Sequence, residues 1–379
     1  MDPLSYLSVG NFIVAVLIYS ALRAFFSRQF VTARNLELPP VVTAAQFEAA
    51  GLGPVAQLGG GAKVDTKSLY LDVVKRAVLN VLFYELSKPS WFYGADRVPE
   101  LADRFSLRRR VLGEDMPANS FSMVGLHRLD NIQECIERAI EEGVEGDFVE
   151  TGAYRGGACI FARAVLKANG IKDRCVVACD TFTAPKPPPS PLSLVFVMPI
   201  VWLLQLLSLI PIKPLRMWLF GVASKFDQDF PSMTLLTTQN ESLLQDWIDM
   251  FFFFLQNVTR FHQSDMSKGI DAVKSYFARF GLLDDQVKFL QGFFADTIPK
   301  AGWLKKVAVL RADGDTYEST IDALNLLYPK LSPGGFCIID DYNSFEACKF
   351  AVDEYRTKHG IDAPLERIDN LSVFWRKAL

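Results

Sequence analysis

Histidine is scarce in this chain, which has three among its 379 residues: His127, His262 and His359. A histidine base is not excluded by so small a number, but carboxylate chemistry is the better first hypothesis for catalysis.

Strong charge of one sign is also missing, since the formal net charge is −3. Nucleic-acid binding requires a basic surface, so nucleic acid is not an expected partner.

Cysteine pairs with the spacing of a zinc ribbon are missing as well. Most of the cysteines lie inside apolar runs, which favours buried, reduced thiols in a cytosol-like compartment. The six are Cys135, Cys159, Cys175, Cys179, Cys337 and Cys348.

Charged residues are absent between Pro3 and Leu22, a stretch long enough to span a bilayer as a helix. Positive charges, beginning with Arg23 and Arg28, follow this stretch, and they predict that the chain after it lies in the cytosol. The basic segment that opens a signal peptide is missing. We therefore expect a single-pass anchor over residues 1–35, with the catalytic domain on the cytosolic or an equivalent reducing side. The alternative is a helix buried in the core.

After a linker and a helical region over residues 36–118, apolar runs alternate with helical patterns, which is typical of a parallel α/β sheet. The expected strands are Val144–Thr151, Arg174–Asp180, Gln286–Gln291, Val307–Asp313, Phe336–Asp341, Leu365–Ile368 and Val373–Arg376. The expected helices are Cys159–Ala168, Tyr317–Leu327 and Phe345–Lys358. The last two strands suit an antiparallel pair. The sequence thus predicts a seven-stranded, mostly parallel sheet in a domain over residues 119–379.

A long interruption separates the second and third expected strands, over about residues 185–264. It opens with the proline-rich run 185–191, which cannot form a regular helix or an inner strand. An uncharged stretch, residues 192–212, follows. Because crossovers rarely need such length, we interpret the segment as an insertion. Its uncharged part could be re-entrant, lie at the membrane surface, or be buried in protein.

A glycine-containing turn, Glu150-Thr-Gly-Ala-Tyr-Arg-Gly-Gly157, joins the first strand to its helix. Ligands of open parallel sheets bind at this strand end, and Gly152 permits a tight turn there. Asp180 ends the second strand, where an acid can accept hydrogen bonds from ribose hydroxyls. The combination of Glu150 and Asp180 is more specific than either residue alone. The alternative for Asp180 is a helix cap or loop acid.

Four carboxylates follow two neighbouring apolar strands. Asp313 and Asp315 end one strand, and Asp340 and Asp341 end the next. The negative charges of these four carboxylates would repel one another unless a cation neutralised them. Carboxylate oxygens are hard ligands, which suit Mg²⁺. A carboxylate outside the metal shell could act as general base. A competing interpretation makes Asp315 the cap of the helix that starts at Tyr317.

Several long stretches resemble the macrocin O-methyltransferase (TylF-type) family. They are Met123–Asn131, Gly146–Gly152, Arg155–Gly157, Phe280–Val287, Asp313–Thr320, and Leu327–Gly335 running into Asp340-Asp341. The resemblance implies a Rossmann-like class I methyltransferase fold, S-adenosyl-L-methionine as methyl donor, and Mg²⁺ or a similar divalent cation. It implies an O-methyltransferase acting on a hydroxyl of a small molecule.

The resemblance also assigns roles to individual positions. The resemblance implies that Asp313, Asp340 and Asp341 are metal ligands. It implies that Asp315 is the catalytic base. The implied cofactor-binding residues are Met123, Val124, Glu150, Thr151, Gly152, Ala153, Tyr154, Asp180, Thr181, Gly292 and Phe293. The membrane segments favour a lipophilic acceptor and a membrane partner, and association into a homo-oligomer is compatible with the pattern.

The chain departs from the family after Asp180, where Thr181-Phe-Thr-Ala184 lacks the acid of the family's Ser-Phe-Glu-Gly run. The insertion and the anchor are further departures. Two alternatives therefore stay open: a catalytically silent methyltransferase-like subunit of a membrane assembly, and a metal-dependent glycosyltransferase. The latter would use Asp313-Gly-Asp315 but leaves Glu150 and Asp180 without a role.

Overall fold

A computed structural model describes residues 44–52, 65–82, 87–88, 106–114, 116–117, 120–182 and 269–379 of the chain. All of these belong to one unit that begins at Val42. The predicted anchor at residues 1–35 and the uncharged stretch 192–212 lie outside the described residues. Within the described ranges, no helix combines the length and apolarity needed to cross a membrane.

The central sheet has seven strands in the order β5-β4-β3-β6-β7-β9-β8. Their bounds are β3 Asp147–Thr151, β4 Val176–Asp180, β5 Val287–Gln291, β6 Val307–Ala312, β7 Leu331–Ile339, β8 Glu366–Arg367 and β9 Val373–Arg376. The first five strands in this order, β5, β4, β3, β6 and β7, pair in parallel with their neighbours. Strand β9 pairs antiparallel with both β7 and β8. The predicted seven-stranded, mostly parallel sheet with a terminal antiparallel pair is confirmed.

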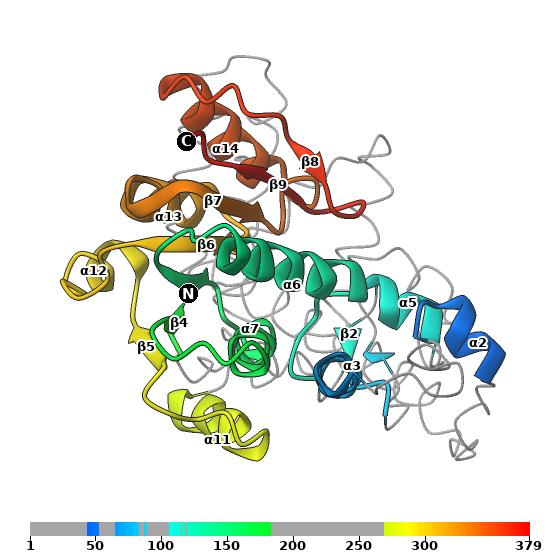
Figure 1. The fold of residues 1–379 in the computed structure, drawn as a ribbon. Helices are drawn as coiled ribbons and strands as arrows, with labels where there is room; N and C mark the ends of the chain where they lie inside the picture. The colour runs from blue at the N-terminus through cyan, green and yellow to red at the C-terminus, as the bar shows by residue number, and fades with distance from the viewer. Residues whose placement is uncertain are drawn as a thin grey trace, which may run out of the picture. The chain divides into compact units, whose positions relative to one another are not determined.

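Helices pack against both faces of the sheet (Figure 1). One face is covered by α6 (Leu126–Glu141), α7 (Gly157–Ala168) and α11 (Ile270–Arg279), and the other by α12 (Phe294–Thr297), α13 (Tyr317–Leu327) and α14 (Glu346–Lys358). A 3-10 helix, η5 (Tyr328–Lys330), follows α13. Because strand side chains alternate, neighbouring residues enter different cores: Phe148 packs toward α6 and α7, and Val149 toward α13.

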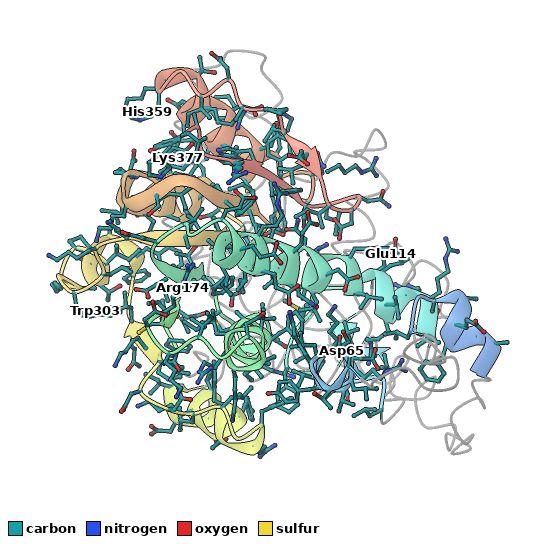
Figure 2. All side chains as sticks on the ribbon, in the orientation of Figure 1. Asp65, Glu114, Arg174, Trp303, His359 and Lys377 are labelled. Atoms are coloured by element: carbon teal, nitrogen blue, oxygen red, sulfur yellow. The ribbon has the colours of Figure 1, made fainter. Side chains whose placement is uncertain are left out.

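Short elements precede this domain: α2 (Ala44–Ala49), α3 (Thr66–Val78), β1 (Ser87–Lys88), α5 (Leu107–Leu112) and β2 (Met116–Pro117). Asp65 caps α3, since its carboxylate accepts from the Lys67 backbone N–H at 3.1 Å (Figure 2). On α3, the Lys75 ammonium lies 5.3 Å from the centre of the Phe161 ring of α7. Lys67 also pairs with Glu137 of α6 at 2.8 Å, so α3 is connected to the domain built on the central sheet.

The start of β7 differs from the prediction, because it begins at Leu331 rather than at Phe336. Pro333, Gly334 and Gly335 are typical of a turn, yet they lie inside the strand. The pairing with β6 shifts there: Val307 faces Leu331, and Val309 already faces Phe336. An irregularity in the pairing thus accommodates the extra residues of β7 without ending the strand.

The cysteines are all free, and five of the six are buried, the exception being the half-buried Cys175. This confirms the expectation of unpaired thiols inside the apolar core.

Candidate active site

Most candidate residues gather where the parallel strands end at their carboxyl termini. Gly152 follows β3, Asp180 ends β4, Gly292 follows β5, Asp313 follows β6, and Asp340 follows β7. Because these five strands are neighbours in the sheet, residues from distant parts of the sequence meet at one edge. This is the edge at which open α/β sheets bind their ligands.

The glycine turn after β3 touches the end of β6. Gly152 has a φ of 83°, and a Cβ atom placed on it would lie 1.6 Å from the carbonyl oxygen of Asp313. The Asp313 backbone N–H in turn donates to the carbonyl oxygen of Thr151 at 2.9 Å. Only glycine can occupy position 152, because both the backbone conformation and the space exclude a side chain.

Asp180 connects the glycine turn after β3 to the loop after β4. Its carboxylate accepts from the backbone N–H of Tyr154 at 3.0 Å and from that of Phe182 at 2.9 Å. Both of these residues have positive φ, 51° and 45°. The Thr181 hydroxyl lies 3.3 Å from the same carboxylate. Burial raises the pKa of Asp180 above its usual value, although these hydrogen bonds oppose the shift.

The chain before α6 lies against the start of α7. The backbone N–H of Gly157 donates to the Phe121 carbonyl oxygen at 3.0 Å, and Val124 donates from its backbone to the Ser122 hydroxyl at 3.2 Å. Val124 is buried, as is Ala153 in the glycine turn, and Met123 is half-buried. The segment that carries Met123 and Val124 therefore lies beside the turn.

Gly292 and Phe293 close the far side of this edge. The backbone N–H of Gly292 donates to the Asp180 carbonyl oxygen at 2.9 Å, and Gly292 has a φ of 136°. Phe293, the residue that precedes α12, is 51% exposed. An aromatic side chain is thus accessible close to Asp180.

Three of the four predicted carboxylates form a tight cluster. Oxygen atoms of Asp313, Asp315 and Asp341 all lie within 4.8 Å of one another. Asp341 is buried, and its Oδ2 atom makes no hydrogen bond to any residue that the structure describes. Asp315 is the exposed member and has a φ of 58°. It does not cap α13, because the Thr316 hydroxyl accepts from the Ser319 backbone at 3.1 Å and is the N-cap; the capping interpretation of Asp315 is therefore wrong.

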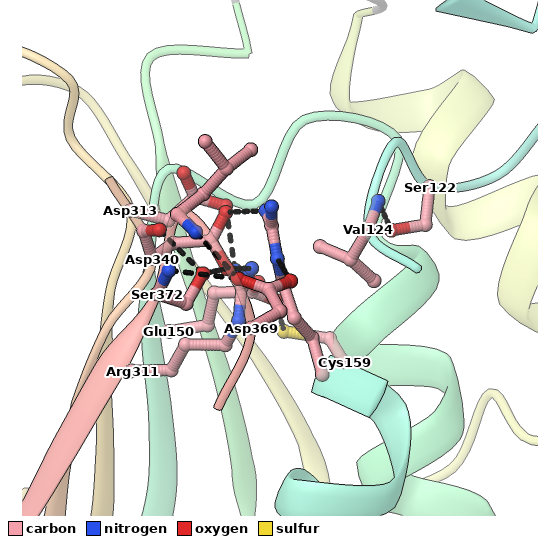
Figure 3. A network of polar contacts seen from close by, with 11 residues as sticks. Ser122, Val124, Glu150, Cys159, Arg311, Asp313, Asp340, Asp369 and Ser372 are labelled. Atoms are coloured by element: carbon pink, nitrogen blue, oxygen red, sulfur yellow. Dashed lines mark hydrogen bonds and ion pairs between the residues drawn. The ribbon is translucent and has the colours of Figure 1, made fainter. Parts of the chain in front are cut away.

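Asp340, the fourth carboxylate, is held by two arginines. Its Oδ2 atom accepts from Arg128 Nη1 of α6 at 2.6 Å, and its Oδ1 atom accepts from Arg311 Nη2 of β6. Arg128 also donates from Nε to Asp369 at 2.6 Å. Figure 3 shows Asp340 and Asp369 together with Arg311 in this network.

Glu150 lies in the same buried network. Its Oε1 atom accepts from Arg311 Nη1, and its Oε2 atom accepts from the Cys159 thiol at 2.8 Å (Figure 3). The side chain is only 2% exposed, so the structure places Glu150 beneath the glycine turn. The Arg311 Nη1 atom that donates to Glu150 also donates to the Asp313 carboxylate at 2.6 Å.

The carboxylates of the cluster differ in their pKa shifts. Burial raises the pKa of Asp313 well above its usual value, and the negative charge of Asp340 adds to the shift. Burial and the charge of Asp315 do the same for the pKa of Asp341. Burial would also raise the pKa of Asp340, but Arg128 and Arg311 outweigh it and hold that pKa below the usual range. Asp313 and Asp341 are therefore the carboxylates whose neutral forms are favoured, whereas Asp340 favours its charged form.

The roles of the two arginines and of Asp369 were not predicted from the sequence. One signal for Arg311 was present: it is a charged residue within the otherwise apolar run 307–312, and a buried charge requires partners. Arg128 and Asp369 gave no comparable signal, since their pairing joins α6 to the loop before β9.

Comparison with known proteins agrees with this architecture. Residues 67–194 and 256–377 match the Macrocin-O-methyltransferase (TylF) family. The chain belongs to this family. Residues 195–255, which the family match leaves out, fall inside the insertion predicted from the sequence.

Similar members of the family are named as O-methyltransferases. The chain is 36% identical over 311 residues to mycinamicin III 3''-O-methyltransferase of Micromonospora griseorubida, covering 82% of this chain and 96% of that enzyme. It is 38% identical over 312 residues to 8-demethyl-8-(2,3-dimethoxy-alpha-L-rhamnosyl)-tetracenomycin-C 4'-O-methyltransferase of Streptomyces olivaceus, covering 82% and 94%. The solved O-methyltransferase NovP superposes with a TM-score of 0.57 at 31% identity, covering 83% of this chain and 100% of NovP.

The macrocin-type family and the fold identify the protein as an O-methyltransferase with a class I methyltransferase fold. S-adenosylmethionine is the methyl donor that this family and fold imply. The glycine turn, Asp180 and Gly292 lie together at the strand ends where such a fold binds its cofactor.

Proposed function

We propose that this O-methyltransferase uses a divalent cation, Mg²⁺ or a similar ion, and methylates a hydroxyl of a small, lipophilic, glycosidic molecule at a membrane. The observation that carries the metal part is the cluster of Asp313, Asp315 and Asp341 beside the glycine turn. When bound, the cation supplies positive charge that favours loss of the acceptor's hydroxyl proton, and the cofactor supplies the methyl group.

The residues present fit a hard divalent cation. All three donors are carboxylate oxygens, the ligand type that Mg²⁺ prefers. The buried Asp341 Oδ2 atom has no hydrogen-bond donor among the described residues, and a cation would satisfy it. Burial and mutual repulsion also raise the pKa values of Asp313 and Asp341, so a cation would relieve a cost that the protein otherwise bears.

The proposed ligands differ from the sequence-based set in one member. Both oxygens of Asp340 already accept hydrogen bonds from arginines, which favours a supporting role for this residue behind the site. Asp315 offers an oxygen to the cluster in its place. As the exposed member, Asp315 is also the candidate base, because the acceptor can approach its second oxygen from solvent.

The cofactor half of the site is assigned to the turn around Gly152 and to the loops that Asp180 orders. Gly152 and Gly292 permit the positive-φ backbone, 83° and 136°, that these strand ends require. Asp180 fixes Tyr154 and Phe182 in their positive-φ conformations, and the exposed Phe293 offers an apolar surface. Met123 and Val124 are assigned to the side of the turn nearest α6.

The glycosidic acceptor is proposed from the names of the relatives, which include methyltransferases of mycinamicin III and of a rhamnosyl tetracenomycin. The membrane part rests on the uncharged stretches 3–22 and 192–212. Most of the second stretch lies in residues 195–255, which the family match leaves out.

Transfer of labelled methyl groups tests the activity. The full chain, labelled S-adenosylmethionine and Mg²⁺ are incubated with membrane extracts, and products are identified by mass spectrometry. A chelator should abolish labelling, and excess Mg²⁺ should restore it. Asp341→Asn should behave like the chelated protein, whereas the control Asp284→Asn, at the opposite sheet edge, should stay active. Full labelling in excess chelator would refute the metal proposal.

Vesicle flotation tests the membrane part separately. The full chain should co-float with phosphatidylcholine vesicles. A variant with Val16→Asp and Leu17→Asp should not, because charges at the centre of a membrane helix are costly. Both proteins should bind S-adenosylhomocysteine equally. Equal flotation of the two would argue against the anchor.

A further inference from the structure

Arg311 lies inside a strand and contacts carboxylates from three neighbouring strands. It is 1% exposed and occupies β6, where it faces Glu150 of β3 and Ile338 of β7 in the pairing register. Its Nη1 atom donates to Glu150 and, at 2.6 Å, to Asp313; its Nη2 atom donates to Asp340. One planar guanidinium thus fixes the relative positions of all three carboxylates.

Two of these three carboxylates belong to different functional parts of the site. Asp313 is a proposed metal ligand, since it belongs to the acidic cluster and is also in contact with Arg311. Glu150 is the residue directly before Thr151 and Gly152 of the cofactor turn. Because Glu150 is buried between Arg311 and the Cys159 thiol, it acts on the turn from below rather than on a ligand.

The backbone joins the same two parts a second time. The Asp313 N–H donates to Thr151, and the Asp313 carbonyl oxygen occupies the space where a Gly152 side chain would lie. A movement of Asp313 therefore cannot leave the turn unchanged. The Arg311 side chain and this backbone contact therefore both connect Asp313 to the cofactor turn.

We infer that Arg311 is a positioning residue that couples the cofactor turn to the carboxylates of the metal site. The inference rests on the proposed metal-dependent function. Since both ligands require the same placement of Asp313, binding of the cation should tighten binding of the cofactor. By linkage, the cofactor should tighten binding of the cation by the same factor.

Calorimetry measures this coupling without catalysis. S-adenosylhomocysteine is titrated into the full chain with and without saturating Mn²⁺, and Mn²⁺ binding is followed in parallel by electron paramagnetic resonance. The native protein should bind S-adenosylhomocysteine at least about fivefold more tightly with Mn²⁺, the lower end of typical coupling between sites. In Arg311→Lys, the ratio of the two affinities, with and without Mn²⁺, should fall close to one, because a point charge cannot bridge three carboxylates.

Two further variants separate positioning from stability. Glu150→Gln keeps the shape of the side chain but breaks the charged link to the turn, so it should also reduce the ratio, and it serves where Arg311→Lys fails to fold. Arg163→Lys is the matched control: this buried arginine pairs with Asp284 at the opposite edge of the sheet. It should lower the unfolding temperature and leave the ratio as in the native protein.

The outcomes distinguish the inference from the function on which it rests. A native protein that binds no Mn²⁺ would refute the metal assignment and the inference with it. Mn²⁺ binding with an unchanged affinity for S-adenosylhomocysteine would refute the coupling alone. A native ratio in folded Arg311→Lys or Glu150→Gln would assign these residues to stability only.

Discussion

Arg128 and Asp340 are separated by 212 positions in the sequence, yet Arg128 Nη1 donates to Asp340 Oδ2 at 2.6 Å. Both side chains are 6% exposed. The contact joins the first turns of α6 to the end of β7 and satisfies the second oxygen of a carboxylate that Arg311 already holds. Asp340 is therefore the member of the acidic group whose two oxygens are both paired with arginines.

Replacing Asp340 by Asn should cost stability before it affects metal binding. Removal of one partner from a buried ion pair typically destabilises a protein by about 3–5 kcal/mol. Chemical denaturation in excess chelator measures this change. Asp130→Asn is the control, because Asp130 pairs with Lys75 at the surface and should contribute about 1 kcal/mol or less.

The opposite result for Asp340→Asn would support the role of metal ligand that was predicted for Asp340 from the sequence. If the variant unfolds at the native denaturant concentration but no longer binds Mn²⁺, Asp340 is a metal ligand and not a support.

Asp315→Asn should affect chemistry more than folding or cofactor binding. Asp315 is the exposed acid of the cluster, so its replacement leaves no buried charge without a partner. Loss of a general base typically slows the chemical step about 10²–10⁴-fold. Because Asp315 is also a proposed metal ligand, single-turnover methyl transfer and the control, S-adenosylhomocysteine affinity, are both measured at saturating Mg²⁺. A native single-turnover rate would remove Asp315 from the role of base.

The sheet could be predicted because buried parallel strands are apolar runs, and the runs that end in Asp180 and Asp313 stand out in the sequence. The meeting of Asp313 with Asp341 followed from neighbouring strand ends. The arginine contacts did not follow, because the pairing of Arg128 with Asp340 depends on how α6 packs across the sheet. The competing interpretation of Asp315 as a helix cap was wrong, since the adjacent Thr316 offers a hydroxyl with the required extended backbone.

The ion pair between Arg163 and Asp284 should make stability depend on acid pH. Arg163 donates to the two oxygens of Asp284 at 3.0 and 2.5 Å, and this hydrogen bonding lowers the pKa of Asp284. A lowered pKa means that the stabilising contribution is complete above the usual aspartate pKa of about 3.9 and is lost as the pH falls through the folded-state pKa.

The comparison that tests this uses Asp284→Asn. The difference in unfolding temperature between native protein and variant should be constant near neutral pH and should shrink as the pH falls below about 4. Since Asp284 is partly exposed, high salt should reduce the difference as well. A difference that grows toward acid pH would contradict the assignment.

Asp180→Ala should weaken binding of S-adenosylhomocysteine. The substitution removes the acceptor for the Tyr154 and Phe182 backbone N–H groups and the proposed acceptor for the ribose hydroxyls. Loss of such a charged acceptor costs about 1.5–3 kcal/mol. Calorimetry on folded variant and native protein gives the value directly. Unchanged affinity would show that Asp180 neither contacts the cofactor nor orders the loops that do.

Gly152→Ala should disrupt both halves of the site, because the added Cβ would lie 1.6 Å from the Asp313 carbonyl oxygen. Either the glycine turn or the end of β6 must move, so affinity for S-adenosylhomocysteine and affinity for Mn²⁺ should fall together. Gly170→Ala separates this clash from backbone strain, because Gly170 also has positive φ, 68°, but no atom lies within 4 Å of its added Cβ. The control should lose only the roughly 1 kcal/mol that an alanine in the left-handed region costs and should bind both ligands as the native protein does. If Gly152→Ala lost cofactor affinity while Mn²⁺ binding stayed native, the turn and the end of β6 would move independently, and the backbone contact between Gly152 and Asp313 would not transmit binding from one half of the site to the other.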